Sequence, residues 1–377
     1  MTASKILTLV RRLTLGSGHA RPLLWRALFL GALCALVGLG SCGKSTRTMS
    51  PDGSLSDNAG DSTGGVAEIE TPEEIAAEDA AENDLANDRA WLESAQRGEF
   101  VAEYQAGEAA PSLSAGQTVV VVGAGDIATS GSGDSQTAKL IEAMPGATVF
   151  TAGDNAYSDG STSNFNSYYA PTWGKFKSRT RPSPGNHDYN TSGAKPYYTY
   201  FGTNAGPSGR GYYSYNVGDW HLISLNSNIS MSSGSKQETW LKADLAANPG
   251  KCVLAYWHHP RFSSGDHGSS TKSKTIWQDL YNAGAEIVVV GHDHNYERFA
   301  PMRADGTKDL ARGIREFVVG TGGKSHYRFT TVQPNSEVRN ADTFGVLELT
   351  LRPEGYDWRF LPTPGGTFTD AGSGTCH

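Results

Sequence analysis

Four short runs of apolar residues stand out in the C-terminal part of the chain, at 119–122, 147–151, 253–257 and 287–290. Each run is continuous rather than alternating, and glycine or histidine follows within two residues. Continuous apolar runs of this length are typical of strands that are covered on both faces. The pattern therefore predicts buried strands with polar residues at their ends.

Three segments between these runs have helical spacing, at 135–144, 237–247 and 273–283. In the second segment Trp240, Leu241 and Leu245 fall on one helix face. Segment 211–225 alternates instead and predicts two antiparallel strands joined at Gly218 and Asp219. Strand and helix alternation with an antiparallel pair predicts an α/β sandwich of mixed sheets. Ligands collect at the carboxyl ends of strands in such sheets, and the polar residues fall there.

The first 41 residues have the pattern of an export signal. Basic residues precede an uncharged run, 27–41, which is too short to span a bilayer and ends in small residues before Cys42. This ending is similar to a bacterial lipobox, in which Cys42 is lipidated and begins the mature chain. The alternative is an ordinary signal peptide with an incidental cysteine. We expect an exported, extracytoplasmic protein that is lipid-anchored to a bacterial membrane, in the periplasm or at the cell surface.

Charge divides the chain into three parts. Residues 1–41 hold five basic and no acidic residues, 42–115 hold four basic and sixteen acidic ones, and the totals of 32 and 39 leave 23 of each sign for 116–377. The middle part is too poor in apolar residues to fold alone, although 71–104 is compatible with a short acidic helix, so we expect a spacer. The near-neutral third part lacks the basic surface of a dedicated nucleic-acid binder.

The cysteines indicate whether the third part, the C-terminal domain 116–377, contains a disulfide. If Cys42 is lipidated and Cys34 is removed with the signal, Cys252 and Cys376 are the two that remain in an oxidising compartment. Two remaining cysteines in an exported protein favour one disulfide, which would join Cys376 near the end of the sequence to the predicted strand that begins at Cys252. Two free thiols are the alternative.

Five polar clusters follow strand-like runs, at 125–126, 153–157, 185–188, 258–260 and 291–294. They supply carboxylates, amides, a phenol and several imidazoles, but no thiolate. This donor set suits borderline or hard metals and argues against a zinc finger or an iron–sulfur site. A glycine before several donors allows the tight turn that brings the backbone close to a metal.

In these clusters the sequence resembles the calcineurin-like binuclear metallophosphoesterases, and among them the purple acid phosphatase branch. The general family begins with an Asp-x-His pair, whereas this chain has Ala128 two residues after Asp126. The purple branch also lacks that histidine and has a tyrosine three residues after the bridging aspartate, where this chain has Tyr157. The run 292–298 is similar to that branch as well. The resemblance implies the metallophosphatase fold, a four-layer α/β/β/α sandwich of two mixed sheets.

The resemblance also implies two metal ions per chain, Fe³⁺ plus a divalent metal (Fe, Zn or Mn). The residues that would hold the first ion are Asp126, Asp154, Tyr157 and His294. Those that would hold the second are Asp154, Asn186, His258 and His292. A phenolate ligand favours a trivalent ion, so Tyr157 is the residue from which iron is expected.

Three further residues have implied roles in catalysis. His187 resembles the family's histidine that contacts the phosphate, and Asp188 is expected to orient it. The family takes the proton for the leaving group from a histidine shortly after the His258 motif, and we favour His267 over the competing His259. The turn 320–323 lacks the spacing of a phosphate-binding loop and is expected to close a strand near the site.

The resulting functional expectation is acid phosphatase-like hydrolysis of phosphate monoesters by a metal-bound hydroxide. A phosphodiesterase or nucleotide hydrolase on the same metal pair is the alternative, because the clusters do not fix the number of ester substituents. A third hypothesis is a surface binding protein with the phosphatase fold but a degenerate metal site. The complete set of metal donors argues against it. The expected partners are a small phosphate ester and, through Cys42, a membrane. The sequence does not predict the oligomeric state.

Overall fold

The structure is a computed structural model that describes residues 116–377. The predicted signal 1–41, the lipidated Cys42, the spacer 42–115 and the 71–104 helix all lie outside the described residues and stay predictions. Between residues 116 and 377 there is no helix with both the length and the apolar character needed to cross a bilayer.

Thirteen strands make up the sheets of the described part of the chain. They are β1 (Val119–Ala124), β2 (Thr148–Ala152), β3 (Thr180–Ser183), β4 (Tyr213–Val217), β5 (Trp220–Ser224), β6 (Cys252–Tyr256), β7 (Ile287–Val290), β8 (Tyr296–Phe299), β9 (Arg315–Val319), β10 (Ser336–Asn340), β11 (Gly345–Arg352), β12 (Gly355–Pro362) and β13 (Ala371–Thr375).

The helices of this part differ widely in length. They are α3 (Gly133–Glu142), α4 (Thr162–Asn164), α5 (Asn186–Asn190), α6 (Lys195–Phe201), α7 (Lys236–Ala247) and α8 (Lys274–Asn282), with shorter helical turns at Phe165–Tyr169, Trp173–Arg179, Ser192–Ala194 and Gly202–Ala205.

The strands form two mixed sheets. The first has the order β13-β12-β11-β1-β2-β3, and the second has the order β10-β8-β9-β7-β6-β5-β4. Strands β1, β2 and β3 are parallel in the first sheet, and β5, β6, β7 and β9 are parallel in the second. Five of these parallel strands, β1, β2, β3, β6 and β7, are followed by the polar clusters.

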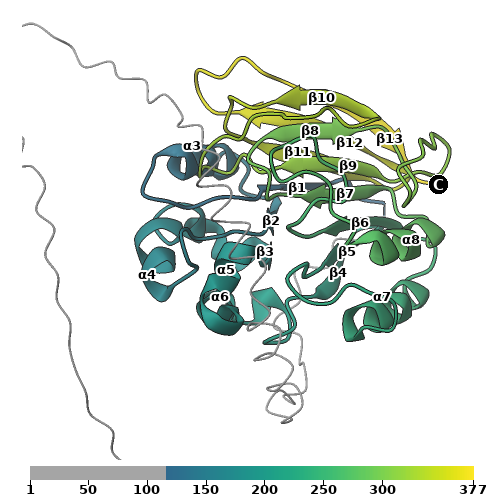
Figure 1. Ribbon diagram of the computed structural model, residues 1–377, viewed down its shortest axis with the longest axis horizontal. Coiled ribbons are helices and arrows are strands. Elements are labelled where there is room, and N and C mark those ends of the chain that lie inside the picture. Colours follow the sequence, from purple (N-terminus) through teal and green to yellow (C-terminus); the bar gives the residue numbers. More distant parts are fainter. Residues whose placement is uncertain (1–115) are drawn as a thin grey trace, which may run out of the picture. The chain divides into compact units, whose positions relative to one another are not determined.

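Helices cover the outer side of each sheet, which gives four layers. Helix α3 packs against β11 of the first sheet, while α7 and α8 contact each other beside the second (Figure 1). The predicted α/β/β/α sandwich of two mixed sheets is confirmed. The predicted strand pair at 211–225 is also confirmed, with β4 and β5 antiparallel on either side of Gly218 and Asp219.

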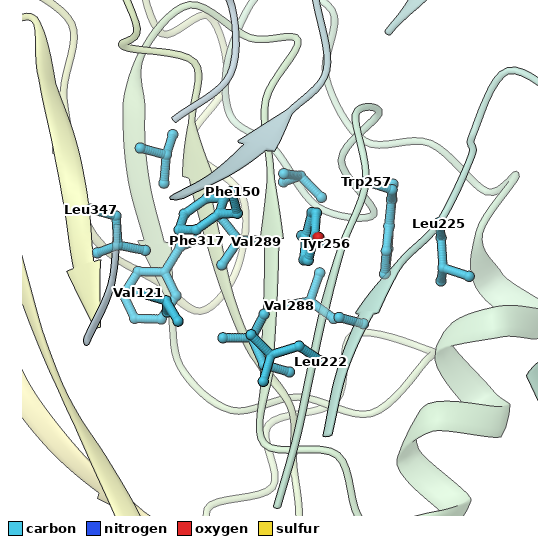
Figure 2. Packing of buried hydrophobic residues seen from close by; sticks show 14 of the residues in the cluster. Val121, Phe150, Leu222, Leu225, Tyr256, Trp257, Val288, Val289, Phe317 and Leu347 are labelled. Atoms are coloured by element: carbon cyan, nitrogen blue, oxygen red, sulfur yellow. The ribbon is translucent and has the colours of Figure 1, made fainter. Parts of the chain in front are cut away.

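The core lies between the two sheets. Val121, Phe150 and Leu347 of the first sheet face Tyr256 and Phe317 of the second (Figure 2). The rings of Phe150 and Tyr256 are 5.7 Å apart. Burial of such side chains contributes roughly 1.5–3 kcal/mol each. This packing fixes the two sheets against each other, so that loops at their ends keep a constant spacing.

The expected disulfide is present between Cys252, the first residue of β6, and Cys376, which follows β13. Their Cα atoms are 5.7 Å apart. The bridge joins the second sheet to the tail of the chain, and the amide of Cys376 also donates to the carbonyl of Glu354.

Candidate metal centre

The polar clusters meet at the carboxyl ends of strands from both sheets. Asp126 and Asp154 follow β1 and β2, and Asn186 begins α5 after β3. His258 follows β6, and His292 and His294 follow β7. The site therefore lies where parallel strands of the two sheets end, as strand topology leads one to expect.

One group of donors surrounds the phenol oxygen of Tyr157. This oxygen lies 2.9 Å from Oδ1 of Asp126, 2.9 Å from Oδ2 of Asp154 and 3.0 Å from Nε2 of His294. All four side chains are buried. A phenol has one proton, whereas both carboxylate oxygens only accept, so this convergence fits a shared cation.

A second group surrounds Nε2 of His258. This nitrogen lies 2.8 Å from Oδ1 of Asn186 and 3.3 Å from Oδ2 of Asp154. The ring of His292 is 5.0 Å from that of His258. The same oxygen of Asp154 thus contacts a member of each group, which is the position of a carboxylate shared between two ions.

The remaining atoms of these side chains tie the loops together. Asp126 uses Oδ2 to accept from the amide of His292 at 2.9 Å, and Asp154 uses Oδ1 to accept from the amide of His187 at 2.8 Å. Nδ1 of His258 donates to the carbonyl of Ala152, so its Nε2 is directed at the centre. Partners of this kind fix ring orientation and tautomer at metal sites.

Backbone strain is concentrated at three of the expected ligands. Asp126, Asp154 and His292 have φ angles of 60°, 50° and 69°, in the left-handed region that residues with a side chain rarely adopt. The neighbouring glycines provide space. A Cβ at Gly185 would lie 2.0 Å from Oδ1 of Asp154, and one at Gly291 would lie 2.6 Å from Oδ2 of Asp126.

Two histidines of the second group, His258 and His292, have pKa shifts of opposite direction. Burial alone would lower the pKa of His258, but Asp154 and Asp126 outweigh it and raise that pKa to about 10. Burial, helped by the neighbouring imidazoles, holds the pKa of His292 well below its usual value. A buried pair of carboxylates next to a neutral imidazole is an environment that favours bound cations. The ligand atoms of Asp126, Asp154 and His258 all lie within 4.8 Å of one another, so the residues present fit a metal.

His187 is held differently from the expectation. Its Nδ1 donates to the carbonyl of Ser158 at 2.5 Å, and its ring packs on Tyr157 with a centroid distance of 4.3 Å. Nε2 of His187 is 3.9 Å from Oδ2 of Asp154. The ring is therefore aimed at the centre by Ser158.

The expectation that Asp188 orients His187 is wrong. Oδ2 of Asp188 accepts from the amide of Gly185 at 2.9 Å and from the side-chain nitrogen of Asn155 at 2.9 Å. Asp188 thus joins the loop that carries Asp154 to the loop that carries Asn186. Burial and then the charge of Asp154 raise its pKa to about 7.

Both candidate proton donors flank His292. The ring of His267 stacks on it with a centroid distance of 3.9 Å, and that of His259 lies 4.5 Å away. His267 is half-buried, whereas His259 is buried and its Nδ1 is 2.6 Å from Oγ of Ser227.

Sequence reasoning missed two residues that contact His294. Tyr327 stacks on His294 with a centroid distance of 3.9 Å, and Oγ of Ser325 is 2.7 Å from Nδ1 of His294. Both follow the turn 320–323, which closes β9 beside the site as expected, because the amide of Gly322 donates to the carbonyl of Gly125. The predicted position of this turn near the site was the sequence signal that could have pointed to Ser325 and Tyr327.

Comparison with known proteins identifies a domain that covers about half of the chain. The model of the calcineurin-like phosphoesterase family matches residues 111–296. An uncharacterised Mycobacterium tuberculosis protein is 30% identical over 185 residues, covering 38% of this chain and 35% of that protein. Purple acid phosphatase 21 of Arabidopsis thaliana is 32% identical over 150 residues, covering 37% and 34%. The chain thus spans about a third of the length of these curated relatives.

Solved structures agree on the fold. A purple acid phosphatase from yellow lupin (Lupinus luteus) seeds superposes with a TM-score of 0.59 at 19% identity, over 70% of this chain and 55% of that one. GAP50 of Plasmodium, described as an anchor in the inner membrane complex, superposes with a TM-score of 0.54 at 15% identity, over 69% and 89%. The chain contains a calcineurin-like phosphoesterase domain and is homologous to the purple acid phosphatases.

Proposed function

We propose that this protein hydrolyses phosphate monoesters at a binuclear metal centre. The observation that carries the proposal is the shared position of Asp154, whose Oδ2 contacts both Tyr157 and His258. The similarity to proteins named purple acid phosphatases supports the same chemistry.

The donor groups divide between two metal positions. Asp126, Asp154, Tyr157 and His294 would hold the first ion, for which the phenol favours Fe³⁺. Asp154, Asn186, His258 and His292 would hold a divalent ion, iron, zinc or manganese. When bound, such a pair neutralises the phosphoryl oxygens and lowers the pKa of bound water.

His187 would bind a phosphoryl oxygen. Its Nδ1 proton is committed to the carbonyl of Ser158, which only accepts. Nε2 of His187 faces the centre beside Asp154. A ring protonated at Nε2 as well would donate to the anionic phosphate, where negative charge gathers.

His267 would donate the proton to the leaving alcohol. The imidazole of His267 stacks on His292, an expected ligand of the second ion, and the residue is half-buried. His259 is buried beneath the same ligand and is engaged by Ser227. The geometry therefore favours His267 for this role.

The protein would act outside the cytoplasm, tethered through a lipidated Cys42 and the acidic spacer. Metabolic labelling with a radioactive fatty acid tests this part. Label in the wild type but not in Cys42→Ser supports the tether, and equal labelling of both contradicts it.

The activity is tested with the full chain, expressed by export. Initial rates are measured on p-nitrophenyl phosphate and on bis(p-nitrophenyl) phosphate from acidic to alkaline pH, with Asp154→Ala alongside. A monoester rate well above the diester rate, abolished by the substitution, supports the proposal. A dominant diester rate supports a phosphodiesterase, and a rate unchanged in Asp154→Ala rules out this centre as its source.

A further inference from the structure

The loop that carries His267 has no regular structure of its own. It runs from the end of β6 at Tyr256 to the start of α8 at Lys274 and includes neither helix nor strand. Much of it is nevertheless buried, with Ser263 at 0% and Ser264 at 1% exposure. Buried backbone amides need acceptors, and a loop outside the sheets must find them elsewhere.

Three buried carboxyl groups supply these acceptors. Glu316 accepts from the amides of Arg261 and Phe262 at 2.8 and 3.0 Å. Glu297 accepts from the amide of Ser264 at 2.7 Å, and Asp293 accepts from the amide of His267 at 3.0 Å. Each carboxyl group is 0% exposed. We call Asp293, Glu297 and Glu316 the anchor residues.

Serine hydroxyls extend two of these contacts. Oγ of Ser264 accepts from the amide of Gln333, so its own proton goes to Oε1 of Glu297, 2.5 Å away. Oγ of Ser336 accepts from Arg339 and donates to Glu297 in the same way. Glu297 therefore faces three donors and acts as an acceptor in all three contacts.

A similar relay involves Asp293. Oγ of Ser263 accepts from the amide of Gly265 at 3.0 Å and donates to Oδ2 of Asp293. A Cβ at Gly265 would lie 2.4 Å from Cγ of Asp293, so the loop passes directly over this carboxylate.

The anchor residues belong to the framework that carries two metal ligands. Asp293 lies between His292 and His294, while Glu297 and Glu316 lie on β8 and β9, which pair with each other. The loop that carries His267 is therefore hydrogen-bonded to the same part of the fold that holds His292 and His294. Its ring stacks on His292 and meets Tyr327 edge-on at 5.2 Å.

We propose that the anchor residues are positioning residues for proton donation, and that they hold the loop so that the His267 imidazole stays stacked on His292. The inference rests on the proposed function, because it assigns the anchor to the step in which the leaving alcohol takes a proton. Glu297 is the residue to test, since it contacts neither His267 nor an expected metal ligand in the structure.

The test compares two phosphate monoesters that differ in their need for an acid. The p-nitrophenolate ion leaves readily without a proton, whereas the alcohol of 2-glycerophosphate does not. In the full chain, Glu297→Gln replaces one of the two accepting oxygens by an amide donor, which faces a donated proton, and this loosens the loop. We expect kcat on 2-glycerophosphate to fall about tenfold or more, within the range for loss of an acid catalyst, and kcat on p-nitrophenyl phosphate to fall less than about twofold.

Two further variants separate positioning from folding. His267→Ala should show the same dependence on the leaving group. The double variant, Glu297→Gln with His267→Ala, should lose little more kcat on 2-glycerophosphate than His267→Ala alone, because both changes remove the same proton donation. Ser264→Ala removes a single donor and should shift the ratio of the two rates in the same direction by less. It serves as the second variant if Glu297→Gln does not fold.

Glu286→Gln is the matched control. Glu286 is also buried and accepts from a backbone amide, that of Val253, but it lies beside the disulfide rather than the anchored loop. It should leave the rate ratio unchanged. An equal decrease on both esters in Glu297→Gln, or additive losses in the double variant, would overturn the inference alone. A wild-type protein inactive on both esters would overturn the proposed function, and the inference with it.

Discussion

The phenol oxygen of Tyr157 lies 3.0 Å from Nε2 of His294, although 137 residues separate them in the sequence. The two side chains come from loops at the ends of different sheets, β2 in the first and β7 in the second. Their contact adds an imidazole from the second sheet to the phenol and the carboxylates of Asp126 and Asp154 from the first. A phenol at this position distinguishes the centre from one built only of carboxylates and imidazoles.

Tyr157→Phe should remove the visible absorption of the iron-loaded protein. The substitution keeps the ring that packs on His187 but deletes the oxygen that would bind ferric iron. The expected result is a coloured wild type and a colourless variant of similar unfolding temperature, measured by absorption spectroscopy and circular dichroism. Equal visible bands in both proteins would show that Tyr157 is not an iron ligand.

Asp188→Ala should weaken metal binding rather than change the role of His187. Asp188 joins the loops of Asp154 and Asn186 through Asn155 and Gly185. Loss of a partner behind the ligands typically costs about 10- to 100-fold in metal affinity. Equilibrium dialysis with zinc measures the change. Asp357→Asn, at an exposed carboxylate on β12, serves as the control and should bind as the wild type does. Unchanged affinity in Asp188→Ala would contradict the assignment.

Removal of the disulfide should lower the free energy of unfolding. The bridge closes a loop of 124 residues, for which chain entropy predicts roughly 4–5 kcal/mol. Cys252→Ser with Cys376→Ser should show this loss in urea denaturation, and reduction of the wild type should reproduce it. A loss below about 1 kcal/mol would mean that the contacts of the tail, such as that between Cys376 and Glu354, suffice without the bridge.

Glu286 should make stability fall as pH rises. Burial raises its pKa from 4.5 to about 7, so the folded state holds a proton that the unfolded state releases between these values. The stabilisation is complete below pH 4.5 and is lost as pH rises through about 7, a change of about 3 kcal/mol. Glu286→Gln keeps a neutral group and should flatten the dependence of unfolding temperature on pH. An identical slope in both proteins would contradict the raised pKa.

The central strands and the convergence of the expected metal donors were predictable because both leave local signals. The runs at 119–122 and 287–290 are apolar throughout, since β1 and β7 are interior strands of their sheets. The donors follow directly, each at the end of a strand. The pairing of Cys252 with Cys376 followed from counting the cysteines that remain after export.

Edge strands and long-range contacts left no such signal. Strand β3 contains Pro182 and β13 is built of small residues, and both lie at sheet edges where continuous apolar runs are not required. The partner of Asp188 was mispredicted because sequence proximity suggested His187, whereas Asn155 lies 33 residues away. The contacts of Glu297 with the His267 loop likewise span 33 residues and are visible only in the fold.

The central claim is that two metal ions share Asp154. The most direct measurement is the metal content of the full chain, purified without chelators and analysed by inductively coupled plasma mass spectrometry beside Asp154→Ala. The account predicts two ions per wild-type chain, iron among them, and loss of both in the variant because each donor group loses the shared carboxylate. One ion or none in the wild type, or two in Asp154→Ala, would contradict it.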